Sequence, residues 1–194
     1  MATTAPTRHL HASDDPELVR TPAVHYVAVP GSGAPGTDDF YRKKLFVGEL
    51  ARTLGDGDAR PVIEIQYWYP EHLLPVEIAD FYSVNPVDAL QYRVMAAVPE
   101  GTTVQELADA RARAGTPDSA ADVVELLTVP EQDVVQVLHH GPFAEELATL
   151  GRLGRFAASL GLRRSGPHHE LHLDAFSRTT PQATLRTILR DPVA

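Results

Sequence analysis

The sequence predicts an α+β fold in which two pseudo-symmetric strand–helix–strand–strand modules form one antiparallel-sheet domain with a central ligand groove. The first observation is a spacing, Gly-x5-Pro-x2-Glu, that occurs twice and begins at Gly55 and at Gly161. The second is that a helical pattern precedes each glycine and a strand pattern follows each proline. A repeat of this size indicates two copies of one supersecondary unit. It also predicts that Glu64 and Glu170 occupy equivalent positions on equivalent strands.

The first module is expected over about residues 21–100. Its strands are rich in β-branched and aromatic residues, and Phe40, Val47 and Leu50 supply the apolar side of its helix. An aspartate is a good N-cap for that helix, and a glycine is a common stop. The expected elements are a strand over 23–29, a helix from Asp38 or Asp39 to about Leu54, and strands over 61–69 and 89–98.

A connecting segment over about 101–130 joins the two modules. Within it, Thr103-x-x-Glu106 is a capping box, which predicts a helix through Ala114. Residues 118–129 fit a helix or a strand equally well, so both remain open.

The second module, over about 131–194, repeats the order of the first. A His-Gly-Pro turn over 140–142 separates its first strand from a helix with Leu150 and Phe156 on its apolar side. The expected elements are a strand over 133–139, a helix over 143–160, and strands over 167–174 and 185–189. A three-stranded sheet under one helix keeps one bare face, and two modules can bury that face against each other. We therefore expect a cleft along their shared axis.

The composition restricts the class of protein. Hydrophobic residues make up 43% of the 194 residues, which is typical of a globular chain. Residues 1–20 are polar and aperiodic, so we expect a flexible arm before a single domain over 21–194. The net charge of −9 argues against nucleic-acid binding, and the absence of cysteine excludes disulfides and a thiol nucleophile. Without a membrane-spanning stretch, signal peptide or cofactor motif, we expect a cytoplasmic monomer or homodimer that needs no cofactor.

Five segments carry a family resemblance. Residues 135–143 read VQVLHHGPF, 168–174 read HHELHLD and 185–193 read LRTILRDPV. Residues 61–68, PVIEIQYW, and 95–99, MAAVP, agree more loosely. In this combination the chain resembles the GyrI-like small-molecule-binding family over nearly everything after its first 20 residues.

The resemblance implies two modules of the SHS2 type around a groove that binds hydrophobic, often planar or cationic, compounds. Some members are fused to DNA-binding domains, whereas the short segment before the first strand makes this chain similar to standalone members. Some of those are hydrolases that open the cyclopropane ring of DNA-alkylating antibiotics. Two positions that are often tyrosine in the family are Phe143 and His172 here.

Glu170 is the leading candidate for a catalytic group. Side chains alternate along a strand, so His168, Glu170 and His172 share one face. The apolar Leu171 and Leu173 are expected to face the helix, which turns Glu170 toward the groove. A carboxylate in an apolar cleft has a raised pKa unless a cation or a donor pairs with it. It can serve as a general base or as the partner of a cationic ligand.

The first module contributes further candidates. Glu64 shares a strand face with Trp68, and pseudo-symmetry predicts that Glu64 approaches the groove from the other side. We expect Trp68 to stack on a planar ligand and Tyr67 to donate a hydrogen bond to a substrate carbonyl as a catalytic group. The remaining expected ligand contacts are His139, Phe143, His168, His172 and Tyr92.

Other chemistries have weaker support. His168-x-Glu170-x-His172 places three metal-binding side chains on one face, but this spacing matches no zinc signature, so we expect no metal. Residues 31–36 have the glycine spacing of a dinucleotide fingerprint without a parallel βαβ pattern. A Gly-x-Ser-x-Gly nucleophile elbow is absent.

The expected function is binding of a hydrophobic planar or cationic small molecule, with hydrolysis of an electrophilic one by cyclopropane ring opening. Detoxification or antibiotic self-resistance is the expected role. Glu170 activates the water in this scheme, and Tyr67 or a histidine stabilises the carbonyl oxygen. Two alternatives stay open: sequestration of lipophilic cations without chemistry, and protection of gyrase by contact with a partner.

Overall fold

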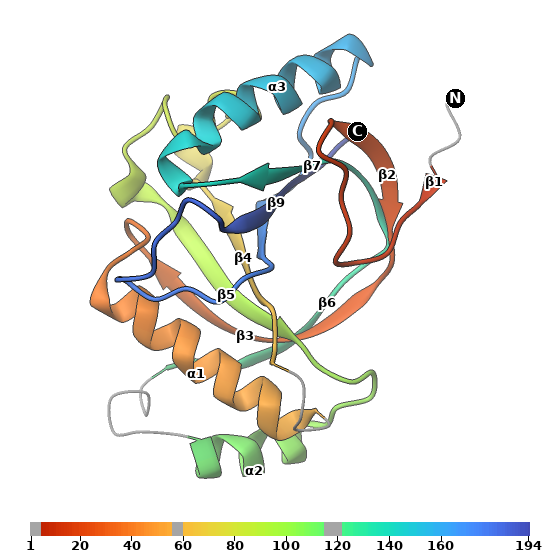
Figure 1. Cartoon of the computed structure of the whole chain (residues 1–194). Helices are drawn as coiled ribbons and strands as arrows, with labels where there is room; N and C mark the ends of the chain where they lie inside the picture. The colour runs from red at the N-terminus through yellow and green to blue at the C-terminus, as the bar shows by residue number, and fades with distance from the viewer. Residues whose placement is uncertain (1–4, 56–59, 115–121) are drawn as a thin grey trace.

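The computed structural model describes residues 5–55, 60–114 and 122–194. Within these ranges nine strands form one sheet in the order β1-β2-β7-β9-β8-β4-β5-β3-β6, in which β1 and β2 pair in parallel and all other neighbours are antiparallel (Figure 1). The strands are β1 (Ala5–Pro6), β2 (Glu17–Thr21), β3 (Val24–Ser32), β4 (Ile63–Trp68), β5 (Gln91–Ala97), β6 (Glu125–Val129), β7 (Gln132–His140), β8 (His168–His172) and β9 (Arg186–Pro192). The helices are α1 (Asp38–Leu54), α2 (Val104–Ala114) and α3 (Glu146–Ser159), with short 3-10 turns η1 (Glu71–Leu73), η2 (Val87–Ala89) and η4 (Phe143–Glu145).

The order of the strands is symmetric about the centre of the sheet. β4 and β8 pair in the middle, β5 and β9 flank them, β3 and β7 follow, and β6 and β2 lie beyond these. The series β3, α1, β4 and β5 therefore recurs as β7, α3, β8 and β9. This confirms the predicted α+β fold of two strand–helix–strand–strand modules.

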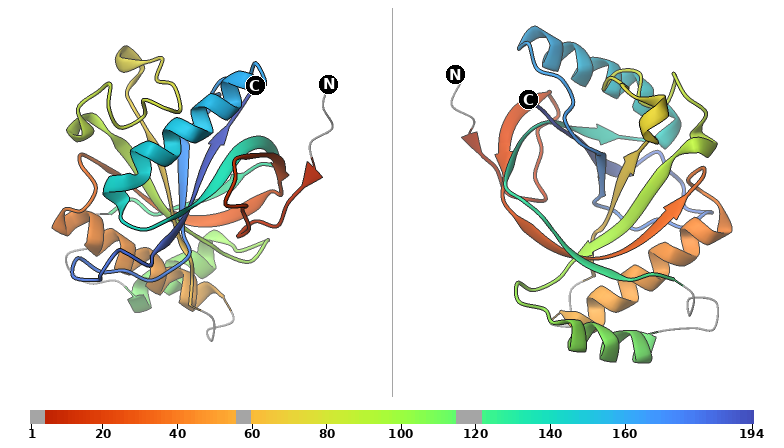
Figure 2. Two further views of the ribbon diagram at one scale, coloured as in Figure 1. Left: turned by 45° about the horizontal axis from the view of Figure 1, so that its top comes forward. Right: turned by 180° about the vertical axis from the view of Figure 1, so that it is seen from behind.

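α1 and α3 lie on the same side of the curled sheet, which we call the helix face (Figures 1 and 2). α1 packs over β3, β4 and β5, α3 packs over β7, and α2 packs mainly on α1. Val47, Leu50 and Leu153 are fully buried in the apolar core between these helices and the sheet. The opposite face carries a smaller apolar cluster around Tyr26 and Met95. Because each helix covers one half of the sheet, the central pair β4 and β8 lies between the two helices.

The helix starts follow local capping chemistry. Thr37 Oγ1 accepts a hydrogen bond at 3.2 Å from a backbone N–H in the first turn of α1, so Thr37 is the N-cap rather than Asp38 or Asp39. The two aspartates instead occupy the first turn, where their charge favours the helix dipole. The capping box of α2 is confirmed, because Glu106 N–H donates to Thr103 Oγ1 and Thr103 N–H donates to Glu106 Oε2.

The expected flexible arm over residues 1–20 is corrected for its described part. Glu17–Thr21 form β2, which pairs with β7 along its whole length. Upstream of β2, His9 Nε2 lies 2.7 Å from Glu64 Oε1 on the opposite face of the sheet. β2 has only five residues, two of them charged, so its sequence shows no strand pattern. Its pairing with β7 decides its conformation. Residues 1–4 lie outside the described ranges.

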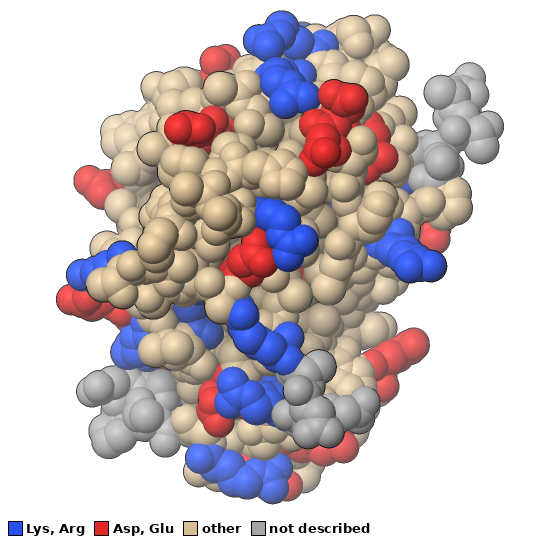
Figure 3. Space-filling view, viewed as in Figure 1, with Lys and Arg blue, Asp and Glu red and all other residues tan. Residues whose placement is uncertain are grey.

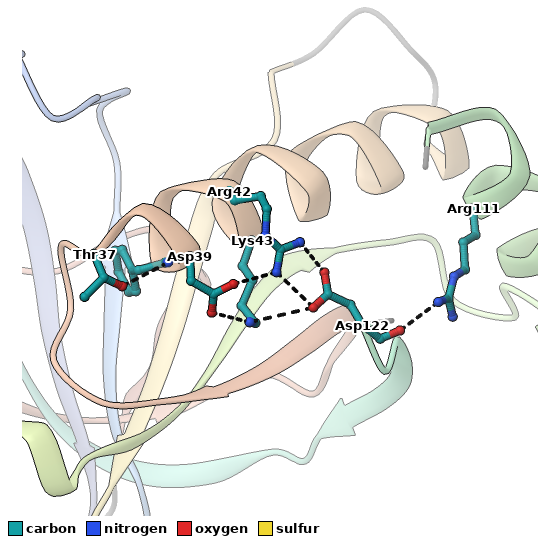
Figure 4. Close-up of polar contacts among 7 residues, drawn as sticks. Thr37, Asp39, Arg42, Lys43, Arg111 and Asp122 are labelled. Atoms are coloured by element: carbon teal, nitrogen blue, oxygen red, sulfur yellow. Dashed lines mark hydrogen bonds and ion pairs between the residues drawn. The ribbon is translucent and has the colours of Figure 1, made fainter. Parts of the chain in front are cut away.

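The connection between the modules ends in a strand. Within the ambiguous stretch 118–129, Glu125–Val129 form β6 and pair with β3, while residues 118–121 lie outside the described ranges. Just before β6, Asp122 accepts hydrogen bonds from Arg42 of α1 at 2.5 and 3.0 Å (Figure 4). This ion pair ties the connection to the first helix.

Candidate functional site

A pocket of about 410 Å³ opens on the helix face, over the centre of the sheet. Its lining includes Tyr67 of β4 and Glu170 of β8, and these two strands are neighbours in the sheet. Tyr82, from the loop between β4 and β5, and Phe176, from the loop between β8 and β9, also line it. The volume lies in the range of small-molecule sites. Further aromatic lining comes from Phe40, Tyr41 and Phe143.

The pocket is on the face that carries the helices, which corrects the expected orientation of β8. We expected Leu171 to face the helix and Glu170 to face away from it. In the structure His168, Glu170 and His172 point to the helix face, and Leu171 points to the opposite one. The physical reason is that α1 and α3 cover the outer strands and leave room above the central pair, so a polar side chain on this face reaches a cavity rather than a helix.

Glu170 is 3% exposed and has three polar neighbours. Tyr82 Oη donates a hydrogen bond to Glu170 Oε1 at 2.5 Å. His172 Nε2 lies 3.3 Å from Oε2, and His168 Nε2 lies 3.6 Å from Oε1. Behind the pocket, His168 Nδ1 is hydrogen-bonded to Asp191 Oδ2 at 3.0 Å. Asp191, His168 and Glu170 thus form a buried chain of polar groups that ends in the pocket.

The histidines keep Glu170 ionised. Burial alone would raise the pKa of Glu170, but the neighbouring His168 and His172 lower it below its ordinary value. Burial also lowers the pKa of His168, but Asp191 and Glu170 on its two sides outweigh that effect and raise the pKa to about 10. Glu170 is therefore an anion and His168 a cation at neutral pH.

Glu146 brings a second carboxyl group to the same pocket. It lies in the first turn of α3 and is 4% exposed. Burial, reinforced by the negative charge of Glu170, raises the pKa of Glu146 well above its ordinary value. Among the described groups, Glu146 Oε1 has no hydrogen-bond partner. The pocket therefore holds one protonated and one ionised carboxyl, a division that separates proton donors from proton acceptors in enzymes.

Two tyrosines add neutral hydrogen-bond donors. The rings of Tyr67 and Tyr82 pack edge to face with centroids 6.2 Å apart. Burial, and then the charge of Glu170, raises the pKa of both phenols well above the ordinary value. Both hydroxyls therefore stay protonated, and an oxyanion that forms in the pocket would meet neutral donors.

Five of the expected site residues belong to this arrangement. Tyr67, Phe143, Glu170 and His172 line the pocket. His168 lies directly behind Glu170, is fully buried, and acts on the pocket through that carboxylate.

Glu64 and Trp68 lie on the opposite face of the sheet. β4 pairs with β8 so that Ile65, not Glu64, is opposite Glu170, and alternation turns Glu64 and Trp68 away from the pocket. Trp68 Nε1 donates a hydrogen bond to Gln91 Oε1 at 2.6 Å on that face. The expected equivalence of the two glutamates is thus corrected: their strands are equivalent, but their faces are not.

Glu64 is the centre of a separate buried polar cluster. His9 Nε2 lies 2.7 Å from Oε1, Tyr26 Oη donates to Oε2 at 2.8 Å, and His169 Nε2 lies 2.9 Å from Oε2. Burial alone would raise the pKa of Glu64, but His169 and His9 lower it to about 2. Arg190 Nη2 donates to the carbonyl oxygen of His9 at 2.8 Å and so holds the N-terminal segment in place.

Tyr92 and His139 also lie outside the pocket. Tyr92 is buried beneath the wall, with its ring centroid 5.4 Å from that of Phe40. His139 Nδ1 is hydrogen-bonded to Thr149 Oγ1 at 2.9 Å, and its Nε2 lies 3.2 Å from the carbonyl oxygen of Pro142. His139 therefore braces the start of α3 against β7.

Glu146 and Tyr82 line the pocket but were not among the residues expected from the sequence. The sequence does contain a signal for Glu146, namely a charged residue at a position where an apolar one is usual. Glu146 precedes Leu150 by four residues and Leu153 by seven, which places it on the buried side of α3. Tyr82 lies in an aperiodic loop, and no local pattern predicts which loop side chains reach a pocket.

The described residues contain neither a metal-binding cluster nor a membrane-spanning helix. His168, Glu170 and His172 share a face, but no group of three His, Asp or Glu side chains in the described part of the chain is arranged to hold a metal ion. No helix in the same part of the chain combines the length and the apolar character needed to cross a bilayer.

Neither a protein-family model nor a curated protein sequence matches this chain. An uncharacterized conserved protein from Listeria innocua is similar in structure, with a TM-score of 0.76 and 25% identity over 94% of each chain. A hydrolase from Listeria innocua gives a TM-score of 0.72 at 23% identity over 95% of this chain and 94% of the other. SAV2435 bound to tetraphenylphosphonium gives a TM-score of 0.53 at 12% identity over 93% and 94%.

These likenesses show the fold that this chain shares with the Listeria innocua proteins. In this shared fold the two modules place their helices on either side of one pocket.

Proposed function

We propose that this GyrI-like protein binds an apolar electrophile in the pocket over β4 and β8 and hydrolyses it by water-dependent opening of an activated cyclopropane. The observation that carries the proposal is the pair of buried carboxyls in one aromatic pocket, Glu170 ionised and Glu146 protonated. The likeness to a structure described as a hydrolase from Listeria innocua supports the same class of activity. Detoxification or antibiotic self-resistance is the role that we propose for it.

The reaction needs a proton acceptor at one end of the substrate and a donor at the other. Water attacks the strained carbon and passes a proton to Glu170, while the carbon–carbon bond breaks and its electron pair moves through the conjugated ring to the carbonyl oxygen. That oxygen takes a proton from Glu146, with Tyr67 and Tyr82 as hydrogen-bond donors. Transfer of a proton from Glu170 to Glu146 restores both groups. One water is added, and no other reagent is consumed.

The partners of Glu170 decide how it acts. His168 and His172 lower the pKa of this carboxyl and therefore weaken it as a base. In exchange, His172 and Tyr82 hold the two carboxylate oxygens in fixed positions at the pocket wall. We therefore assign most of the effect of Glu170 to orienting the water and less to basic strength.

The charge of the site favours a second function, binding of lipophilic cations. Glu170 is a buried carboxylate beside the aromatic rings that line the pocket. Such surroundings suit a large organic cation. The SAV2435 structure holds tetraphenylphosphonium, which makes this cation the natural probe.

Mass spectrometry of an aryl cyclopropane-dienone incubated with the protein tests the hydrolase. The expected product is heavier by one water. Glu170→Gln should lower turnover by about 100-fold or more and leave substrate binding intact, because the apolar lining is unchanged. Glu145→Gln is the matched control, because Glu145 is the exposed neighbour of Glu146 outside the pocket, and it should keep full turnover.

Titration with tetraphenylphosphonium separates the two functions. A cation-binding protein without chemistry would leave the dienone unchanged, and Glu170→Gln would weaken cation binding about tenfold. Full turnover together with full cation affinity in Glu170→Gln would contradict the role of Glu170 in both functions.

A further inference from the structure

A second pocket of about 380 Å³ adjoins the first. Tyr41, His172 and Phe176 line both pockets, so an aromatic wall separates them. The other side of the second pocket is formed by the outer side of α1, the residues that lead into β4, and the loop after β8. Of the expected functional residues, only His172 lines this cavity, so an inference about the cavity does not rest on the function proposed above.

The second pocket contains an unusual lysine. The chain has only two lysines, and they are adjacent in α1. Lys43 is ion-paired with Asp39 and lies 3.7 Å from Asp122, between the two carboxylates (Figure 4). Lys44 is 7% exposed and forms no ion pair with any described carboxylate. The two lysines therefore have opposite electrostatic surroundings at neighbouring positions.

The contacts of Lys44 leave its ammonium group available for a ligand. Lys44 Nζ lies 3.0 Å from the centroid of the Phe176 ring, and it donates only a long hydrogen bond of 3.4 Å to the carbonyl oxygen of Phe176. Burial, and then the positive charge of Arg60, lowers the pKa of Lys44 to about 7. A buried amine with a cation and no anion beside it lacks the counter-charge that such groups normally have.

The other charged groups of the pocket do not supply that counter-charge. Arg60 also lines the pocket and forms no ion pair with a described residue. Each acidic group there already has an arginine: Glu49 contacts Arg52 at 2.5 Å, and Asp174 contacts Arg186 at 2.8 Å. The titratable and charged side chains that line this pocket are Tyr41, Lys44, Glu49, Arg52, Arg60, His172, Asp174 and Arg178, the last paired with Asp38 at 2.7 Å.

The wider surface agrees with this excess of positive charge. Figure 3 shows Lys and Arg side chains gathered over the region of α1 and α2, although the chain as a whole has a net charge of −9. The apolar lining of the pocket comes from Leu45, Ile63 and Phe176. A ligand that fits must therefore combine an acidic group with a flat apolar body.

We propose that the second pocket binds a small aromatic carboxylate or sulfonate, whose acidic group pairs with Lys44 and Arg60 while its ring packs on Phe176. The anion supplies the counter-charge that the protein itself does not provide for Lys44. The ring faces the same aromatic wall that bounds the first pocket, so the two cavities take ligands of opposite charge preference.

Calorimetry with 2-naphthoate and its neutral isostere 2-naphthamide tests the proposal. Naphthoate should bind at least about tenfold more tightly than the amide, the scale of one charge-assisted contact. Lys44→Met should remove that difference, and Lys43→Met, the adjacent and ion-paired control, should keep it. Equal affinities for the two ligands in the unaltered protein, or an unchanged preference in Lys44→Met, would overturn the proposal.

The pH dependence of naphthoate binding distinguishes a charge contact made by Lys44 from a purely structural role of this residue. Naphthoate affinity should fall about tenfold as the pH rises from 6 to 8.5, because Lys44 loses its proton near pH 7. Lys44→Arg should keep the binding and abolish this fall. A pH dependence that persists in Lys44→Arg would contradict the role of Lys44.

Chemical modification identifies the cavity. Limited acetylation should modify Lys44 faster than Lys43, and naphthoate should protect Lys44 alone. Equal protection of both lysines would contradict binding in the second pocket.

Discussion

The two carboxyls of the first pocket differ in protonation because their neighbours differ. Glu170 has two histidines within 3.6 Å and a phenol that donates to it, so its charged form is stabilised. Glu146 is also buried but has no such partners, so burial, reinforced by the negative charge of Glu170, stabilises its neutral form. The same residue type thus takes opposite roles through placement alone.

Replacement of Glu146 by glutamine should reveal its protonation state. A group whose pKa is raised on folding contributes stability below its unfolded value of 4.5, and that contribution is lost as the pH rises. Glu146→Gln removes this loss. The difference in free energy of unfolding between the variant and the unaltered protein should therefore shift in favour of the variant by more than ~1 kcal/mol between pH 4 and pH 8, the free energy of one pKa unit. Urea unfolding at both pH values measures the change.

The exposed neighbour provides the control for that experiment. Glu145→Gln should leave the free energy of unfolding within about 0.5 kcal/mol at both pH values, as is usual for surface sites. If Glu146→Gln and Glu145→Gln behave alike, Glu146 is ionised in the folded protein, and it is not the proton donor.

At the scale of elements, the sequence predicted which segments form strands and helices but not which face each strand presents. The repeat that begins at Gly55 and Gly161 correctly matches β4 with β8, because turn and strand residues act locally. The facing of Glu64 depends on the register between β4 and β8, and a shift of one residue reverses every side chain. Register is set by contacts between distant segments, so the spacing within each copy contains no information about it.

A close approach between elements also had no sequence signal. α3 passes the loop before β5 at Gly154, where an added Cβ would lie 2.8 Å from Ala79 Cβ and 2.9 Å from its backbone nitrogen. At Gly151 on the same helix, an added Cβ meets only the flexible end of Arg155 at 3.5 Å. The two glycines are three residues apart, yet only one of them is required by packing.

Alanine at these two positions should therefore have opposite effects. Gly154→Ala should lower the free energy of unfolding by about 1–3 kcal/mol, the usual cost of overpacking. Gly151→Ala should raise it by up to about 1 kcal/mol, because alanine favours a helix over glycine. Thermal or urea unfolding of the pair measures this. A stabilised Gly154→Ala would show that α3 does not approach the loop as closely as the structure places it.

At the scale of the whole molecule, the sheet separates two buried charge clusters. One, on the helix face, contains Asp191, His168 and Glu170. The other, on the opposite face, contains Glu64 and His169 beneath the N-terminal segment. His168 and His169 are adjacent on β8, so strand alternation alone directs one histidine to each cluster. The two clusters should therefore contribute independently to the pH dependence of the stability of the fold.

The two clusters should act in different pH ranges. The pKa of Glu64 is lowered from 4.5 to about 2, so its contribution is complete above pH 4.5 and is lost as the pH falls toward 2. The pKa of His168 is raised from 6.5 to about 10, so its contribution is complete below pH 6.5 and is lost as the pH rises toward 10. Each contribution is on the order of 3 kcal/mol or more, from the size of these shifts.

Two single variants should therefore flatten opposite ends of the stability profile. Glu64→Gln keeps the size of the side chain and removes its titration, so the free energy of unfolding should fall less steeply than in the unaltered protein below pH 4.5 and equally steeply above pH 6.5. Asp191→Asn removes the main charge that raises the pKa of His168, so this variant should show the reverse pattern. Urea unfolding between about pH 3 and pH 9 measures both profiles. A variant that changed both ends equally would show that the sheet does not separate the clusters, because independent sites on its two faces should contribute additively.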